Sequence, residues 1–277
     1  MAFTTQLKQF LYPIYIPLKN NFLQKKKAKE LFNKHQGKAF NHAALSEAPL
    51  KIFSTRNEDD IIVRIIASLN IAQGTFLDLG SNDCINSNCA NLVFNFDWKG
   101  YFVDADQKLL AIGQKNYQLK GKNNVSFIES FIEPENINEL LKKNLHETNI
   151  DFMNIDIDGN DYAIWNAIDY IKPKIVLVEN KIEYGLEDIV IPQNKNFESH
   201  EWGASLYSFW KLGFQKGYTL VATNKEGFNA FFILNDWVDN ALFKALSMEQ
   251  IQENRTITAS FYSPESILAL KNRLKSA

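Results

Sequence analysis

The sequence is poor in cysteine, in long apolar runs and in net charge, and each shortage excludes a class of protein. Neither the number nor the spacing of Cys84 and Cys89 indicates a disulfide framework or a zinc site. No apolar run approaches the roughly 20 residues that span a bilayer, and no signal-peptide pattern is present, so we expect a cytoplasmic protein. A formal net charge of −2 gives no bias toward nucleic acid, which we do not expect as a partner.

The charge that is present lies unevenly along the 277 residues. Residues 1–40 hold eight lysines, no arginine and one acid, Glu30, which leaves this segment at +7. An apolar stretch with two prolines, residues 10–18, precedes Lys25, Lys26 and Lys27. Two interpretations stay open. Either the segment contacts an anionic membrane surface, which would place the protein at the inner membrane face, or it is an arm that packs on the body or on a second subunit, as in a homodimer.

From residue 50 onward, apolar patterns typical of strands alternate with patterns typical of helices. The predicted helices span residues 53–69, 88–96, 107–118, 135–145, 161–168 and 204–216. The predicted strands span residues 75–79, 100–104, 124–128, 152–156 and 174–179, followed by a hairpin of 217–222 and 228–234. Repeated strand–helix units predict a doubly wound, mostly parallel sheet.

Five strands of this kind, a helix and a terminal hairpin form the element order of class I methyltransferases. We therefore predict an α/β fold with a Rossmann-like sheet of about seven strands and an antiparallel hairpin at its end. The domain prediction is a basic, helical N-terminal extension over residues 1–50, a main domain over 51–237 and a helical tail over 238–277.

The most informative segment is Ile155-Asp-Ile-Asp-Gly-Asn-Asp-Tyr162, which follows an apolar strand. Carboxylates crowded at the end of a buried strand repel one another unless a positive or polar group lies between them. In open α/β sheets the carboxyl ends of the strands are where ligands bind. The segment therefore predicts a site for a metal or a polar substrate.

The loop after the first strand is acidic and contains a single glycine, Gly80, whose lack of a side chain lets a ligand approach the backbone. Asp78 and Asp83 can accept hydrogen bonds, and a phosphate-binding loop would be rich in glycine and free of acids. The loop favours a ligand with a cationic end, such as S-adenosylmethionine with its sulfonium and ammonium groups. The alternative is a tight turn capped by Asn82 or Asp83.

The second strand ends at Asp104, followed by Ala105 and Asp106. An acid at this position suits hydrogen bonding to ribose hydroxyls, whereas Asp106 can instead cap the next helix. A nicotinamide-dependent enzyme would use the same acid, but the acidic first loop and the terminal hairpin disfavour that class.

The fourth and fifth strands end at Asp156 and at Glu179-Asn180. Because adjacent strands lie about 4.8 Å apart, these side chains can share one hard cation such as Mg²⁺, Mn²⁺ or Fe²⁺, with Asp158 as an alternative or extra ligand. In the other interpretation, Asp158, Asn160 and Asp161 cap the following helix and Asp156 binds substrate without metal.

Two further residues are candidates for catalysis. His200 lies in a predicted loop and can serve as a general base, although a lone loop histidine is more often only solvated. Lys181 follows the metal candidates closely enough in sequence to contact a substrate.

Several segments together resemble the FkbM-like S-adenosylmethionine-dependent methyltransferases over residues 50–235. They are Phe53-Ser-Thr-Arg-Asn-Glu-Asp-Asp-Ile-Ile62, similar to a Ser-Gln-x-Gly-Glu-Asp-Gly-Ile pattern, Leu77-Asp-Leu-Gly-Ser-Asn-Asp83, the segment 155–162, Gly203-Ala-Ser-Leu206, Lys216-Gly-Tyr218 and Asn229-Ala-Phe-Phe232. Three residues depart from the pattern: Cys84 stands at a usual second glycine, and Thr55 and Asn57 replace the usual Gln and Gly.

The resemblance implies binding of S-adenosylmethionine, with Glu58 and Asp59 near its methionine end and Glu129 and Ser130 near its adenine. The alternative for Glu129 is a solvated loop acid. It also implies O-methylation of a hydroxyl on a nucleotide-linked sugar or a surface or capsular glycan. The strand-end acids are similar to the Asp and Asp-Asn metal site of catechol-type and macrolide-sugar O-methyltransferases. The alternatives are another small polyol as substrate, or a non-catalytic domain that binds a glycan or a partner.

Overall fold

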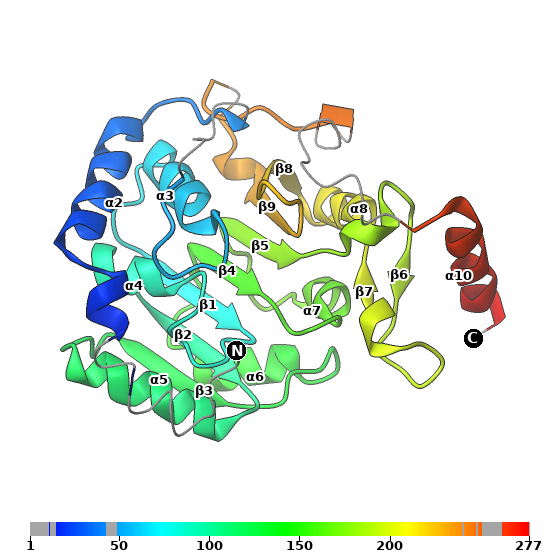
Figure 1. Ribbon diagram of the computed structural model, residues 1–277, viewed down its shortest axis with the longest axis horizontal. Coiled ribbons are helices and arrows are strands. Elements are labelled where there is room, and N and C mark those ends of the chain that lie inside the picture. Colours follow the sequence, from blue (N-terminus) through cyan, green and yellow to red (C-terminus); the bar gives the residue numbers. More distant parts are fainter. Residues whose placement is uncertain are drawn as a thin grey trace.

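A seven-stranded sheet forms the centre of the computed structural model, which describes residues 11, 15–42, 49–239, 241–247, 249–250 and 262–276. The strands are β1 (Thr75–Leu79), β2 (Lys99–Asp104), β3 (Val125–Glu129), β4 (Phe152–Ile155), β5 (Ile175–Glu179), β8 (Tyr218–Thr223) and β9 (Asn229–Leu234), in the order β3-β2-β1-β4-β5-β9-β8 (Figure 1). Strands β1 to β5 pair in parallel, and β9 pairs antiparallel with both β5 and β8. This confirms the predicted Rossmann-like methyltransferase sheet with its terminal hairpin.

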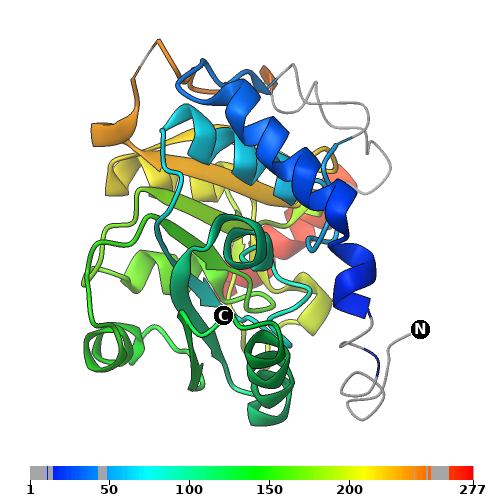
Figure 2. The ribbon, with the colours of Figure 1, turned by 90° about the vertical axis from the view of Figure 1, so that its left-hand side faces the viewer.

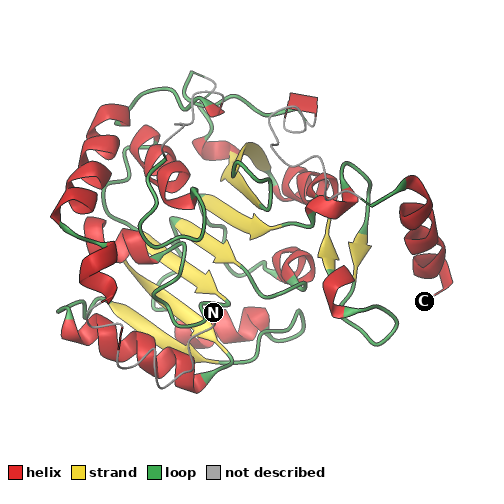
Figure 3. Cartoon of the chain, in the orientation of Figure 1, coloured by secondary structure: helices red, strands yellow, loops and turns green. Residues whose placement is uncertain are grey.

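Helices cover both faces of the sheet (Figures 1 and 3). One face packs on α3 (Glu58–Ser68), α4 (Ala90–Phe96) and α5 (Gln107–Leu119), and the other on α6 (Ile137–Asn144), α7 (Asp161–Ala167) and α8 (Leu206–Lys216). Successive strand residues point to opposite faces. Phe76 and Phe102 therefore join the first core, whereas Leu77 and Val103 join the second.

Short elements complete the chain after β5. They are η2 (Ile182–Tyr184), β6 (Val190–Ile191), η3 (Ser199–Glu201), β7 (Gly203–Ala204), η4 (Asn235–Trp237) and α10 (Pro264–Ser276). Strands β6 and β7 form a separate antiparallel pair. The helix predicted from residue 204 therefore begins later, at Leu206, where the Ser205 hydroxyl caps it by accepting from the Ser208 N–H at 3.0 Å.

The first helix of the main domain also begins later than predicted, at Glu58 and not at residue 53. Asp59 causes the difference, because its buried carboxylate accepts hydrogen bonds from the backbone N–H groups of Ile52, Phe53 and Ser54 at 2.7–3.0 Å. These bonds hold residues 52–54 as a loop that leads into α3. Asp59 thus organises the loop. We expected it near the methionine end of the cofactor, but it does not line the cavities described below.

The predicted helical tail is correct only in part. Residues 264–276 form α10, but residues 241–247 are not helical. Their backbone instead pairs with other parts of the chain, for example through the Phe40 N–H to the Leu242 carbonyl at 2.7 Å and the Leu246 N–H to the Leu220 carbonyl at 3.1 Å. Residues 251–261 of the tail lie outside the described part of the chain.

The N-terminal helix α2 (Phe22–His35) lies beside α3 and α4 (Figure 2). Phe32 is buried with its ring centroid 5.6 Å from that of Phe96, and the Asn20 and Asn95 side-chain amides exchange hydrogen bonds at 3.1 Å. The described part of the extension is therefore an arm packed on the body. Much of the predicted apolar stretch, including residues 12–14, lies outside the described residues, so contact with a membrane surface or a second subunit stays a prediction.

None of the helices formed by the described residues has both the length and the apolar character needed to cross a membrane.

The packing of the arm predicts unequal effects for two phenylalanines on the same helix. Phe32 is 6% exposed and Phe22 is 78% exposed. We expect Phe32→Ala to lower the free energy of unfolding by about 3 kcal/mol, the usual cost of truncating a buried phenylalanine. Phe22→Ala, the matched control, should change it by less than about 0.5 kcal/mol. Urea unfolding measures both, and equal stability of the two variants would contradict the packed arm.

Candidate functional site

Two adjoining cavities open where the central parallel strands end. The first, of about 230 Å³, lies beside the ends of β2 and β3, and the second, of about 440 Å³, extends toward β5. They share four lining residues, Gly80, Asn82, Asp156 and Asp158. The hollow therefore lies at the strand ends where the sequence predicted a site.

Gly80 is required at the boundary between the two cavities. Its φ is +84°, and a Cβ at this position would lie 1.9 Å from the carbonyl oxygen of Asp156. No larger residue fits, because the loop after β1 passes directly against the backbone at the end of β4. The glycine was predicted for a close approach to a ligand, and the structure shows a close approach to the chain itself.

The rest of this loop is a tight turn, as the alternative interpretation held. The Asp83 carboxylate accepts from the N–H groups of Ile85 and Asn86 at 3.0 Å, and the Asn82 side chain accepts from the Asp83 N–H at 2.8 Å. Cys84 has a φ of +60°, in the region that favours glycine. Asn82 and Asp83 nevertheless line the second cavity, so the turn and the predicted binding role are compatible.

Asp78 lies buried on the wall of the second cavity. Its carboxylate accepts from the Ser87 hydroxyl at 2.6 Å and from the Asn154 amide at 2.7 Å. Burial raises its pKa to about 6, against the opposing effect of these two hydrogen bonds.

The first cavity is built around Asp104. Its carboxylate accepts from the Asn82 N–H at 2.7 Å and from the Asp106 N–H at 2.8 Å, and lone pairs remain for a ligand. Ala105 and Ser130, which we predicted to contact a cofactor, line the same cavity. Asp106 caps α5 by accepting from the N–H groups at its start, which is the alternative role proposed for it.

Glu129, predicted near adenine, is instead exposed at the end of β3 and does not line the cavity. The sequence reasoning missed Phe131, a 65% exposed ring at the rim, together with Ile132 and Gln193. The available signal was an aromatic residue two positions after the acidic end of a strand.

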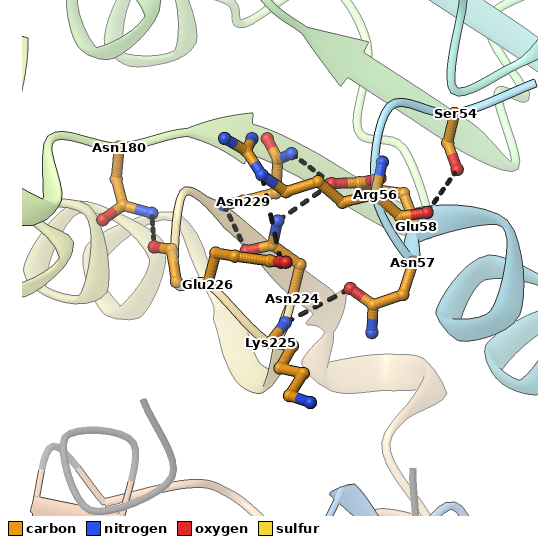
Figure 4. Close-up of polar contacts among 10 residues, drawn as sticks. Ser54, Arg56, Asn57, Glu58, Asn180, Asn224, Lys225, Glu226 and Asn229 are labelled. Carbon is orange, nitrogen blue, oxygen red and sulfur yellow. Dashed lines mark hydrogen bonds and ion pairs between the residues drawn. The ribbon is translucent and has the colours of Figure 1, made fainter. Parts of the chain in front are cut away.

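Glu58 connects the loop before α3 to the terminal hairpin (Figure 4). One carboxylate oxygen accepts from the side-chain amides of Asn224 and Asn229 at 2.9 and 2.8 Å, and the other from the Arg56 N–H at 2.9 Å. Its buried carboxylate lines the second cavity. Segments 166 and 171 residues apart in sequence thus meet at the predicted methionine end.

Three carboxylates gather at the ends of β4 and β5: Asp156, Asp158 and Glu179, with one oxygen of each within 4.8 Å of the others. Burial and then the nearby Glu179 raise the pKa of Asp156 well above its usual range. Burial and then Asp161 raise the pKa of Glu179 to about 7. Oxygen atoms at this spacing can coordinate one hard divalent cation.

Asp161 belongs to the supporting structure. It accepts from the N–H groups of Ile157 and Gly159 at 3.0 Å, which fixes the turn that presents Asp158. Burial raises its pKa to about 6. Asn160, the other predicted cap, makes no side-chain capping bond to α7.

Two predicted site residues do not join this cluster. The Asn180 amide donates to the carbonyls of Gly227 and Phe228 at 2.8 Å, and the residue lines neither cavity. Asn180 follows the end of β5 at Glu179, and its side-chain amide points to the terminal hairpin and not into the cluster (Figure 4). His200 lies exposed on η3 and also lines neither cavity.

Lys181 lies near the cluster without lining either cavity. Its N–H donates to the Ala204 carbonyl at 2.8 Å, and its side-chain carbons lie over Gly203. After the effects of burial and Asp161, its positive charge opposes the rise in the pKa of Glu179.

Comparison with known proteins gives structural likenesses alone, since no protein-family model and no curated protein sequence matches the chain. An S-adenosylmethionine-dependent methyltransferase from Aquifex aeolicus is 14% identical, with 58% of this chain and 82% of that chain covered and a TM-score of 0.39. The M. capricolum protein TrmK, in complex with S-adenosylhomocysteine, is 17% identical, with 75% and 83% covered and a TM-score of 0.41. A methyltransferase from Geobacter sulfurreducens, also with S-adenosylhomocysteine, is 15% identical, with 54% and 59% covered and a TM-score of 0.37. At these values the likenesses add nothing to what the strand order shows.

The raised pKa of Glu179 predicts a stability that falls with increasing pH. Because its pKa rises from 4.5 to about 7 on folding, the folded state retains a proton that the unfolded state releases between these pH values. The glutamine of Glu179→Gln does not titrate, so the variant avoids this loss. In the presence of a chelator, we expect its free energy of unfolding, measured relative to that of the wild type, to increase by about 1–3 kcal/mol from pH 5 to pH 8.

Urea unfolding at the two pH values measures this gain. The exposed Glu135 provides the control, since Glu135→Gln should follow the wild type at both. Parallel pH profiles for the wild type and Glu179→Gln would show that the buried glutamate has an ordinary pKa.

Proposed function

We propose that the protein is an S-adenosylmethionine-dependent O-methyltransferase that acts on a sugar hydroxyl. The observation that supports this most directly is the continuity of the hollow. A cavity with an acid at the end of β2 adjoins, across Gly80, a cluster of carboxylates at the ends of β4 and β5. A nucleoside and a reacting hydroxyl can thus be held side by side.

The residues present fit S-adenosylmethionine from end to end. Asp104 suits the ribose hydroxyls, and Phe131 offers a ring against which adenine can pack. The second cavity is strongly acidic, which suits the ammonium and the sulfonium of the methionine part better than it suits a pyrophosphate. When bound, the cofactor would supply a methyl group on a positively charged sulfur.

Methyl transfer to oxygen is an in-line displacement. A C–O bond to the acceptor forms as the C–S bond breaks, S-adenosylhomocysteine leaves, and the hydroxyl proton passes to a base. Glu179 is the best matched base among the described residues, because a pKa of about 7 allows it to accept a proton near neutral pH. Alignment of the hydroxyl with the methyl group is the other requirement.

A divalent metal also fits the cluster, as an alternative in which Glu179 is a ligand and not the base. Asp156, Asp158 and Glu179 would hold it, and the predicted ligand Asn180 would not take part. Mg²⁺, Mn²⁺ or Fe²⁺ there would lower the pKa of a bound acceptor hydroxyl and bind two neighbouring oxygens. That preference for a vicinal diol, together with the family resemblance, supports a sugar, either nucleotide-linked or part of a surface or capsular glycan.

The proposed ribose contact predicts a specific loss of affinity. We expect Asp104→Asn to weaken binding of S-adenosylmethionine by about 1.5–3 kcal/mol, the range for loss of a hydrogen bond to a charged group. Isothermal titration calorimetry measures it. Asp106→Asn is the matched control, because Asp106 caps α5 two residues away and lines neither cavity. Unchanged affinity in Asp104→Asn would remove Asp104 from the cofactor site, and wild-type protein that binds no cofactor would refute the proposed function.

The metal proposal predicts one binding site per chain. We expect Mn²⁺ to bind the wild type in an electron paramagnetic resonance titration, and Asp158→Asn to weaken this binding at least tenfold, or about 1.4 kcal/mol. Asp106→Asn again serves as the control. Equal Mn²⁺ binding by the wild type and Asp158→Asn, or no binding by either, would refute the proposed metal site. O-methylation without a metal would then remain as the proposal.

A further inference from the structure

Arg56 lies at the edge of the second cavity, in the loop before α3 (Figure 4). Its guanidinium carbon is 4.1 Å from the ring centroid of Phe228, a cation–π contact that restricts its position. The nearest carboxylate oxygen, on Glu226, is 3.9 Å from the Arg56 Nε, which is too far for a hydrogen bond. That oxygen is buried and has no hydrogen-bond partner among the described residues. The guanidinium therefore keeps its donors available.

Arg56 is also unusual in its charge. Among the described residues that line this cavity it is the only cation, and six are acids: Glu58, Asp78, Asp83, Asp156, Asp158 and Glu179. Its charge opposes the rise in the pKa of Glu179, but its guanidinium forms no hydrogen bond with any of these six carboxylates. The guanidinium therefore offers five N–H donors in a planar arrangement suited to phosphate or carboxylate.

The sheet order places Arg56 on the acceptor side of the hollow. The contacts proposed for the ribose and the adenine are on β2 and β3, on one side of β1, whereas Phe228 directly precedes Asn229, which pairs with Glu179 between β9 and β5. Arg56 thus lies away from the nucleoside, beside Glu58, in the part of the hollow where the methionine part and the acceptor would meet.

We propose that the acceptor carries a phosphate or carboxylate group, and that Arg56 binds this group beside the hydroxyl to be methylated. This inference rests on the proposed function and narrows its substrate to anionic sugars, such as sugar phosphates or uronic acids. The hydroxyl oxygens of a neutral sugar could accept hydrogen bonds from the guanidinium, but these bonds are weaker than the charge-assisted, bidentate bonds that a phosphate or carboxylate forms. The carboxylate cluster repels anions, so the negative group lies at the Arg56 end of the cavity, away from the reacting oxygen.

The test uses the full chain loaded with S-adenosylhomocysteine and titrated with hexose 1-phosphates, hexuronic acids and the parent neutral hexoses. We expect the wild type to bind at least one anionic probe at least tenfold more tightly than its neutral parent, and Arg56→Gln to lose that preference. Arg56→Lys should retain part of it, because the charge stays and the planar geometry is lost. Lys225→Gln is the matched control, since this neighbouring lysine points away from Arg56 in Figure 4 and does not line the cavity.

The affinity for S-adenosylmethionine distinguishes a failure of the anionic-acceptor proposal from a failure of the proposed methyltransferase function. We expect Arg56→Gln to bind the cofactor within twofold of the wild type and to keep its melting temperature. If Arg56→Gln weakens S-adenosylmethionine but not its decarboxylated analogue, Arg56 binds the methionine carboxylate and the inference is wrong. It is also wrong if the wild type binds the cofactor but no anionic probe. A wild type that binds no cofactor refutes the proposed function itself.

Discussion

Acidic side chains crowd the carboxyl ends of β1, β4 and β5 with few cations among them, and the organisation of the site depends on how their charge is balanced. The fold balances part of it with neutral donors. Asp78 accepts hydrogen bonds from Ser87 and Asn154, and Glu58 accepts them from two asparagines of the terminal hairpin. Asp161 accepts hydrogen bonds from backbone N–H groups. These acids are structural components, and Asp78 and Glu58 are also parts of the cavity wall.

The three carboxylates of the cluster, Asp156, Asp158 and Glu179, differ from these acids. They accept no hydrogen bond from the described residues, so only a molecule or ion bound in the hollow can supply a donor or a positive charge. Burial and mutual repulsion raise the pKa of Asp156 and of Glu179 as a result. A proton, a divalent cation or the sulfonium end of a cofactor would relieve this repulsion. The cluster is therefore suited to a reaction in which positive charge is bound and a proton is removed, as methyl transfer to a hydroxyl requires.

Much of this site could be predicted from the sequence, because strands with alternating or apolar patterns end at identifiable polar residues. Asp104, Asp156 and Glu179 were predicted in this way, and all three line the cavities. The direction of the Asn180 side chain was not readable, because this residue follows the end of β5 and its amide bonds to two carbonyls of the distant hairpin. The contacts of Glu58 with Asn224 and Asn229 were not readable, because residues so distant in sequence leave no local pattern. The delayed start of α3 depends likewise on buried hydrogen bonds to Asp59 that helix propensity does not reveal.

In the proposed function, a nucleoside cavity and a carboxylate cluster meet across Gly80 as one site. A crystal structure of the protein with S-adenosylhomocysteine would show whether they do. We expect ribose hydroxyls within hydrogen-bond distance of Asp104, adenine beside Phe131, and the sulfur directed across Gly80 toward Asp156 and Glu179. A nucleoside bound elsewhere, or a sulfur directed away from these carboxylates, would contradict this proposal.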